Sequence, residues 1–107
     1  MTTFRGTNRS QKLVGTALAD TILGFGGNDV LIGNAGRDTV RGGTGRDTIT
    51  GGRGADRLYG DAGNDKIYGG TENDLIFGGA GLDTLRGDAG IDTIDGGTEA
   101  DTAFGGD

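Results

Sequence analysis

Single aliphatic residues recur every nine positions along almost the whole chain, and each stands at the centre of a short β-branched or polar triplet. Alternate side chains of a strand point to opposite faces, so such a triplet predicts a three-residue strand with one inward side chain. Glycine-rich stretches between the triplets supply the positive φ angles that tight turns require. The expected inward residues are Leu13, Ile22, Leu31, Val40, Ile49, Leu58, Ile67, Ile76, Leu85, Ile94 and Ala103.

An aspartate keeps the same nine-residue spacing without insertion or deletion. Numbered from its leading glycine, each unit has the form G-G-x-G-x-D-x-U-x, where U is the aliphatic residue, and the copy from Gly42 to Thr50 is the cleanest. A fixed period of this kind predicts a repeat architecture. The candidate metal-ligating side chains, all at position six, are Asp20, Asp29, Asp38, Asp47, Asp56, Asp65, Asp74, Asp83, Asp92 and Asp101.

Composition excludes several classes of protein. Glycine contributes 26 of 107 residues, but the lack of proline and of a three-residue period excludes collagen. A net charge of -6 with scattered basic residues argues against nucleic-acid binding. Without histidine or cysteine, and with Ser10 as the single serine, the chain has no catalytic triad, zinc ligand set or disulfide, so we expect no enzyme. No apolar run is long enough to span a membrane.

Two nine-residue units can close one coil of eighteen residues with a strand on each side. Coils stacked at about 4.8 Å would place aspartates two units apart, such as Asp47 and Asp65, in two columns of like charge. Carboxylates about 5 Å apart repel by roughly 1 kcal/mol in water and several-fold more at lower dielectric. A hard divalent cation removes this repulsion, and turn carbonyls complete an all-oxygen site that suits Ca²⁺ better than Mg²⁺. The alternative is a row of solvated or turn-forming aspartates.

These frames resemble the RTX, or haemolysin-type, calcium-binding repeat from about Gly15 to Phe104. The resemblance implies an all-β fold, a right-handed parallel β-roll with 18 residues per coil, in which each Ca²⁺ lies between turns two units apart. Its ligands there are two position-six aspartates, the carbonyls of positions one and three of one turn, and those of positions two and four of the other. One such site would join Asp47 and Asp65, and the pairs 20/38 through 83/101 give at most eight ions.

The resemblance also implies backbone carbonyl ligands from the glycines of these turns. The glycines concerned are Gly33, Gly36, Gly42, Gly43, Gly45, Gly51, Gly52, Gly54, Gly60, Gly63, Gly69, Gly70, Gly78, Gly79, Gly81, Gly87, Gly90, Gly96 and Gly97.

The expected organisation has three parts. Residues 1–14 are a degenerate repeat or N-terminal cap, residues 15–104 form a β-roll of ten nonapeptide repeats, and residues 105–107 are a truncated repeat. A flexible leader is the alternative for the first part. Solenoids need an atypical end unit to cover the first core layer, which favours the cap.

Departures from the frame predict where the turns differ. Thr16 and Leu18 stand where glycines are expected, so the turn between Gly15 and Leu23 should be distorted. Asn or Asp at the second glycine position is mild, because both tolerate left-handed backbone. Glutamate at the third glycine position predicts strained or altered turns. The milder residues are Asn34, Asp61 and Asp88, and the glutamates are Glu72 and Glu99.

The predicted activity is cooperative calcium binding coupled to folding. A glycine-rich chain loses much conformational entropy on ordering, and one aliphatic residue per unit is a small core, so we expect disorder without calcium. The resemblance implies a secreted, extracellular bacterial protein exported unfolded by a type I system, in which the repeats are a structural or folding module of a larger toxin, enzyme or adhesin. The alternative is a free-standing calcium-binding or surface-layer component.

The outward-facing residues bear on two surface functions, self-association and ice binding. Tyr59 and Phe77 occupy position nine on the same side of the roll, with Leu75 nearby, and could form a patch for self-association. The simpler interpretation is that the rings shield the edge of the narrow core. Ice binding is disfavoured, because the residues at positions three and five do not form a regular ladder.

Overall fold

The computed structural model describes residues 2–97 and the strand 102–104. All elements in these ranges are strands, and those of three residues predominate, as the triplets predict. No helix capable of crossing a membrane occurs in the described part of the chain. The strands are β1 (Thr3–Arg5), β2 (Lys12–Val14), β3 (Thr21–Leu23), β4 (Val30–Ile32), β5 (Thr39–Arg41), β6 (Thr48–Gly52), β7 (Arg57–Tyr59), β8 (Lys66–Gly70), β9 (Leu75–Phe77), β10 (Thr84–Arg86), β11 (Thr93–Asp95) and β12 (Thr102–Phe104).

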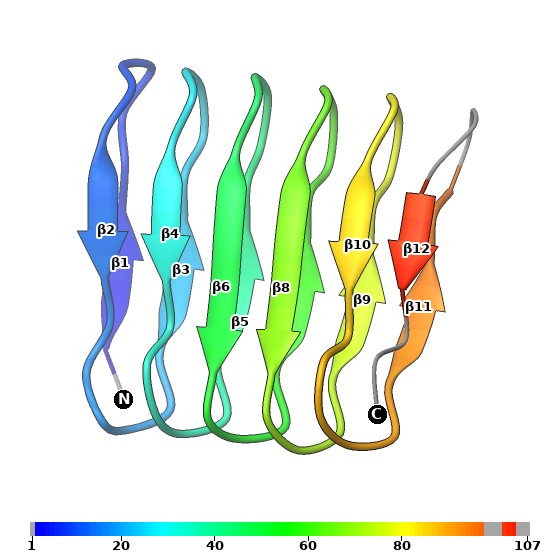
Figure 1. Cartoon of the computed structure of the whole chain (residues 1–107). Helices are drawn as coiled ribbons and strands as arrows, with labels where there is room; N and C mark the ends of the chain where they lie inside the picture. Colours follow the sequence, from blue (N-terminus) through cyan, green and yellow to red (C-terminus); the bar gives the residue numbers. More distant parts are fainter. Residues whose placement is uncertain (1, 98–101, 105–107) are drawn as a thin grey trace.

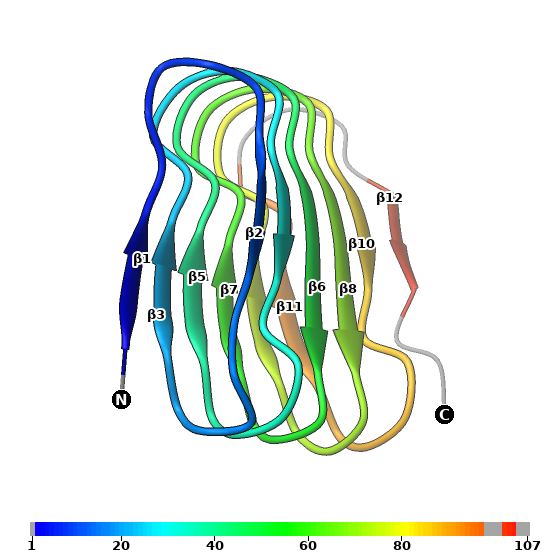
Figure 2. The same cartoon turned by 90° about the vertical axis from the view of Figure 1, so that its left-hand side faces the viewer.

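Successive strands alternate between two parallel sheets that face each other (Figures 1 and 2). Odd-numbered strands follow the order β1-β3-β5-β7-β9-β11, and even-numbered strands follow β12-β10-β8-β6-β4-β2. The register is eighteen residues, so that Val40 pairs with Leu58 and Ile49 with Ile67. In Figure 1 the chain descends along the even strands, passes behind and rises along the odd strands while it advances, which makes the coil right-handed. The expected right-handed parallel β-roll is confirmed.

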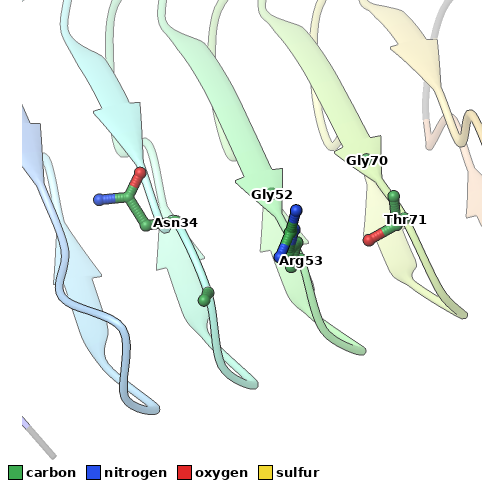
Figure 3. A pocket seen from close by; sticks show the side chains of 6 residues that line it. Asn34, Gly52, Arg53, Gly70 and Thr71 are labelled. Carbon is green, nitrogen blue, oxygen red and sulfur yellow. The ribbon is translucent and has the colours of Figure 1, made fainter.

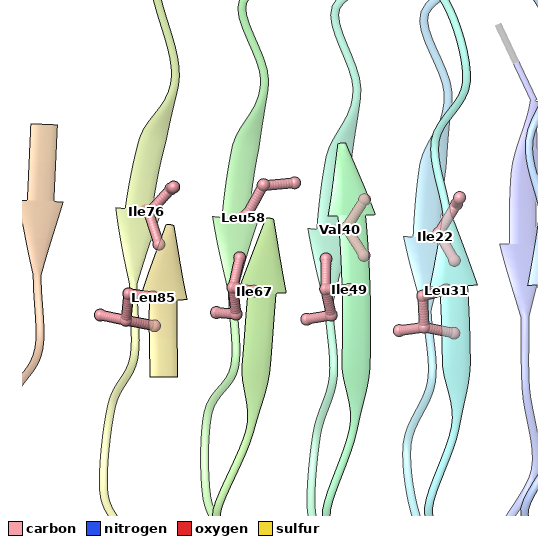
Figure 4. Packing of buried hydrophobic residues seen from close by; sticks show 8 residues of the cluster. All are labelled: Ile22, Leu31, Val40, Ile49, Leu58, Ile67, Ile76 and Leu85. Carbon is pink, nitrogen blue, oxygen red and sulfur yellow. The ribbon is translucent and has the colours of Figure 1, made fainter. Parts of the chain in front are cut away.

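The core consists of two facing rows of aliphatic side chains, one row from each sheet (Figure 4). Each side chain is fully buried, and Phe4, Leu13 and Ile94 pack against the rows with partial burial. The backbone of Ala103 pairs with Leu85 and so continues the register. The prediction of one inward residue per unit is confirmed for the fully buried set: Ile22, Leu31, Val40, Ile49, Leu58, Ile67, Ile76 and Leu85.

From the unit that begins at Gly24 onward, the described turns obtain their curvature from left-handed residues at positions two and four. Asn34 (φ 73°), Asp61 (φ 67°) and Asp88 (φ 65°) hold the left-handed position-two conformation that glycine adopts elsewhere, as expected. Glu72 adopts φ 70° at position four, a conformation that costs a residue with a side chain free energy. Phe25 adopts φ 68° at position two. The sequence reasoning overlooked Phe25, although a bulky residue in a glycine position was the available signal.

Candidate metal centre

The position-six aspartates lie at the end of each turn and are stacked in two columns, one along each edge of the roll. From Asp38 to Asp92, Oδ1 of each column carboxylate accepts a hydrogen bond from the main-chain N–H of the aspartate eighteen residues earlier. The N–H of Asp20 donates to Asp38 and that of Asp38 to Asp56, each over 2.8 Å. In the other column the N–H of Asp29 donates to Asp47 over 2.8 Å. Each aspartate therefore holds the next in register.

The second carboxylate oxygen, Oδ2, is buried and lacks a hydrogen-bond partner in most of the column. The side chains from Asp29 to Asp74 are at most 1% exposed. A buried carboxylate oxygen without a partner is costly unless a cation or a proton neutralises it. Among the described residues, Oδ2 accepts no hydrogen bond in Asp29, Asp38, Asp47, Asp56, Asp65, Asp74 and Asp92.

The position-one glycines form a cradle of oxygen atoms around this orphaned oxygen. A Cβ on Gly42 would lie 2.6 Å from Oδ2 of Asp47 and 2.8 Å from the carbonyl oxygen of Gly60, one coil further on. A Cβ on Gly51 would lie 2.6 Å from Oδ2 of Asp56. The space beside each glycine is thus bounded by a carboxylate and a carbonyl oxygen. Such hard oxygen donors fit Ca²⁺.

Carboxylates alone cannot complete a metal site in this fold. No group of three or more Asp or Glu side chains gathers around one point in residues 2–97. Six to eight oxygen ligands are usual for Ca²⁺, so backbone carbonyls must supply the rest. The residues therefore fit Ca²⁺ only if two carboxylates and several turn carbonyls bind the ion together.

The position-two carbonyls already take part in hydrogen bonds between turns. The N–H of Arg53 donates to the carbonyl of Asn34 over 2.8 Å, and that of Thr71 to the carbonyl of Gly52 over 3.0 Å. A carbonyl oxygen has two lone pairs, so one remains for a cation. The glycine carbonyl ligands that the family resemblance implies stay a prediction. At position two, the same carbonyl oxygen would have to accept a hydrogen bond and bind the cation.

Burial dominates the protonation of the columns. It raises the pKa of Asp65 to about 8; a hydrogen bond from the N–H of Asp47 opposes the rise, and the negative charges of Asp47 and Asp83 add to it. Burial likewise raises the pKa of Asp56 and of Asp74 to about 7. Without a cation, the middle of each column is therefore only partly ionised at neutral pH.

Further acidic side chains lie close to the columns. The negative charge of Asp61 contributes to the raised pKa of Asp47 and of Asp65, and the charge of Glu72 does the same for Asp56 and Asp74. These groups strengthen the field that attracts a cation. The sequence reasoning treated Asp61 and Glu72 only as turn residues. An acidic residue at a glycine position beside the aspartate column was the missed signal.

Asparagines at position five tie neighbouring turns together. Oδ1 of Asn28 accepts from the N–H of Arg46, and Oδ1 of Asn64 accepts from the N–H of Leu82, each over 2.8 Å. Asn73 makes the same bond to the N–H of Ile91. Since each bond spans one coil of eighteen residues, these bonds fix the spacing between the turns that flank the cradles. Asparagine at a fixed place in the frame was the signal that the sequence offered.

Asp20 differs from the rest of its column. Its Oδ2 accepts hydrogen bonds from the main-chain N–H of Thr16 over 2.6 Å and from the hydroxyl of Thr16 over 2.8 Å. Burial raises the pKa of Asp20, but these bonds, together with one from the N–H of Thr2, outweigh it and leave the pKa lowered. At the other end, Asp101 and Glu99 lie outside the described residues.

A hollow on the outer edge of the roll is lined by Gly52 and Gly70, two of the expected carbonyl ligands, but by no column aspartate. It is open to solvent and runs over three successive turns (Figure 3). The residues that line the hollow are Asn34, Ala35, Gly52, Arg53, Gly70 and Thr71.

Comparison with known proteins identifies the nine-residue repeat. The family model of the RTX calcium-binding nonapeptide repeat (4 copies) matches residues 5–40, 32–67, 41–76, 59–94 and 86–107. No curated protein and no solved structure matched the chain. Because the overlapping matches extend over nearly the whole sequence, the chain belongs to the family of RTX calcium-binding nonapeptide repeats.

Proposed function

We propose that this chain is a calcium-binding module whose β-roll becomes stable when calcium binds between its coils. The observation that supports this most strongly is the pair of buried columns in which successive aspartates keep an Oδ2 without a hydrogen-bond partner, as in Asp47 and Asp65. The turn carbonyls beside them, such as that of Gly60, supply the remaining oxygen donors. Binding and folding are coupled because the site exists only when two coils are stacked.

The free energy available from binding is sufficient for such coupling. At a free calcium concentration ten times the dissociation constant, each site stabilises the folded chain by about 1.4 kcal/mol. Eight sites would contribute about 11 kcal/mol, which is the whole stability of a typical domain. Because each aspartate from Asp38 to Asp83 belongs to two neighbouring pairs, occupation of one site aligns the next, and we expect binding to be cooperative.

The coupling suits a protein that is exported unfolded and folds outside the cell. Membership of the repeat family supports a secreted bacterial protein, in which the roll is a structural or folding module of a larger chain. Export by a type I system belongs to this proposal. A free-standing calcium-binding or surface-layer component is the alternative, and we propose a binding role, not catalysis, in both cases.

Circular dichroism during a calcium titration tests the proposal. The far-UV spectrum should change from disordered to β at a sharp calcium threshold and return when chelator is added. Magnesium at the same concentration is the control and should order the chain much less. A spectrum that chelator leaves unchanged would refute the coupling of binding to folding.

The candidate self-association patch contains two stacked rings and a cation–π contact. The rings of Tyr59 and Phe77 are stacked with their centres 5.2 Å apart, and the guanidinium of Arg41 lies 4.5 Å above the Tyr59 ring. Leu75 precedes Phe77 on the same strand by two residues. We propose that a second copy of the chain binds this face in the calcium-loaded state. Sedimentation in calcium should show a dimer that Phe77→Ser abolishes, whereas a monomer at all concentrations would exclude the patch.

A further inference from the structure

The first two turns of the roll are closed by threonine in place of left-handed glycine. The Oγ1 of Thr7 accepts from the N–H of Arg9 over 3.2 Å, and the Oγ1 of Thr16 accepts from the N–H of Leu18 over 3.1 Å. Both threonines stand at position two of their units, and neither Arg9 nor Leu18 at position four has a positive φ. The same device therefore begins both edges of the roll.

Each of these threonines also binds the side chain at position six. The hydroxyl of Thr7 donates to Oε1 of Gln11 over 3.1 Å, and the hydroxyl of Thr16 donates to Oδ2 of Asp20 over 2.8 Å. In Gln11 the acceptor is an uncharged amide, whereas in Asp20 it is the carboxylate oxygen that lacks a partner in Asp29 and Asp38. The hydroxyl of Thr16 thus binds the carboxylate oxygen that a cation would bind elsewhere in the column.

Asp20 is fully hydrogen-bonded by the chain itself. Its Oδ1 accepts from the N–H of Thr2 over 3.1 Å, and its Oδ2 accepts both the N–H and the hydroxyl of Thr16. Asp29, which begins the other column, offers the closest comparison, because its Oδ1 accepts from the N–H of Gln11 over 3.0 Å while its Oδ2 has no partner. The difference between the two aspartates is the residue at position two, Thr16 against Phe25.

We propose that the coil containing Thr7 and Thr16 is a calcium-independent cap, and that Asp20 is not a calcium ligand. This inference rests on the proposed calcium binding of the other pairs. It lowers the number of aspartate pairs that bind calcium from eight to seven by removing the pair 20/38. It departs from the family pattern at Asp20, because the hydroxyl of Thr16 binds the carboxylate oxygen that has no partner in Asp29 and Asp38.

Counting bound ions distinguishes the cap from a calcium site. Calorimetric titration of the whole chain should give the same number of ions for Asp20→Asn as for the unaltered protein, and fewer for Asp56→Asn. The double substitution Thr16→Gly with Leu18→Gly restores the frame and should add one ion, which Asp20→Asn should then remove. Thr44→Gly, at position three of another unit, is the matched control and should leave the number unchanged.

The outcomes separate this inference from the proposed function. One ion lost in Asp20→Asn alone would overturn the cap while leaving calcium binding intact. No calcium bound by the unaltered chain would instead overturn the proposed function. Anomalous scattering from crystals of the unaltered chain grown in calcium is a test that requires no variant. Peaks should lie between Asp38 and Asp56 and between Asp29 and Asp47. A peak within bonding distance of Asp20 Oδ2 would refute the cap.

Discussion

The main-chain N–H of Asp47 donates a hydrogen bond of 2.8 Å to Oδ1 of Asp65, one coil further along the chain. One residue type thus supplies both the donor and the acceptor that join adjacent coils. The bond orients each carboxylate so that its other oxygen points to the position-one glycine of its own turn, as Oδ2 of Asp65 does toward Gly60. Structural alignment and the candidate calcium ligand therefore reside in the same side chain.

Replacing Asp56 by asparagine separates these two roles. The amide oxygen can still accept from the N–H of Asp38, so the register is kept, but the negative charge and one carboxylate oxygen are lost. Asp56 belongs to two aspartate pairs, so two ions should be lost, at a cost of about 3 kcal/mol at tenfold saturation. The calcium midpoint followed by circular dichroism should rise accordingly.

Asp95→Asn is the matched control for Asp56→Asn. Asp95 is exposed at the end of β11, and its Oδ1 accepts from the N–H of Gly97, which asparagine can also do. The change in net charge is identical in the two variants. Equal shifts of the calcium midpoint would show that overall charge, and not the buried column, controls binding.

Alanine at Gly60 tests the oxygen cradle. Its Cβ would lie 2.6 Å from Oδ2 of Asp65 and 2.7 Å from the carbonyl oxygen of Gly78, closer than real Cβ contacts allow. Such overpacking destabilises by about 1–3 kcal/mol or more, and the melting temperature in calcium should fall by several degrees. Gly26→Ala is the control, because its nearest neighbours are atoms of Asn8 at 3.1 Å or more. Equal losses in the two variants would contradict the cradle.

Much of the fold was predictable because one physical requirement recurs in every unit. An inward aliphatic residue such as Val40, with glycines before it, leaves few alternatives to a short strand and a tight turn. The column aspartates followed from the same period. Local exceptions were harder to predict, because the frame describes only what all units have in common. The bond from Thr16 to Asp20, for example, depends on one hydroxyl. The stack of Tyr59 on Phe77 depends on rotamers that periodicity does not determine.

Phe25 is a position at which the fold is strained and can be improved. It holds φ 68° at position two, where Asn34 holds φ 73° one unit later, and a non-glycine residue in this conformation costs about 1–3 kcal/mol. Asparagine tolerates it best. Because Phe25 is 44% exposed, the lost burial of the ring offsets part of the gain, and Phe25→Asn should raise the stability in calcium by at most about 1 kcal/mol.

Leu82→Asn controls for the loss of an exposed apolar side chain in Phe25→Asn. Leu82 is 52% exposed and has no positive φ, so its replacement should leave the denaturation midpoint nearly unchanged. Urea denaturation in saturating calcium measures both variants. A destabilised Phe25→Asn would mean that contacts of the ring outweigh the backbone strain.

Acidification should order the chain partly without calcium. Burial raises the pKa of Asp65 to about 8 and that of Asp56 to about 7 in the metal-free roll, against 3.8 for an ordinary aspartate. A folded-state pKa above the unfolded value means that the folded chain binds protons more tightly. The stabilisation is therefore complete below about pH 4 and is lost progressively as the pH rises from about 4 to about 8. In chelator, the β signal should be larger at pH 5.5 than at pH 8.5.

Saturating calcium should reverse this dependence, because protons and calcium compete for the same carboxylates. The calcium midpoint should therefore fall as the pH rises from 5.5 to 7.5. Light scattering at each pH separates ordering from aggregation as the net charge of -6 is neutralised. A metal-free chain that gained β structure on raising the pH, or a calcium midpoint that did not depend on pH, would show that the buried aspartates do not control folding.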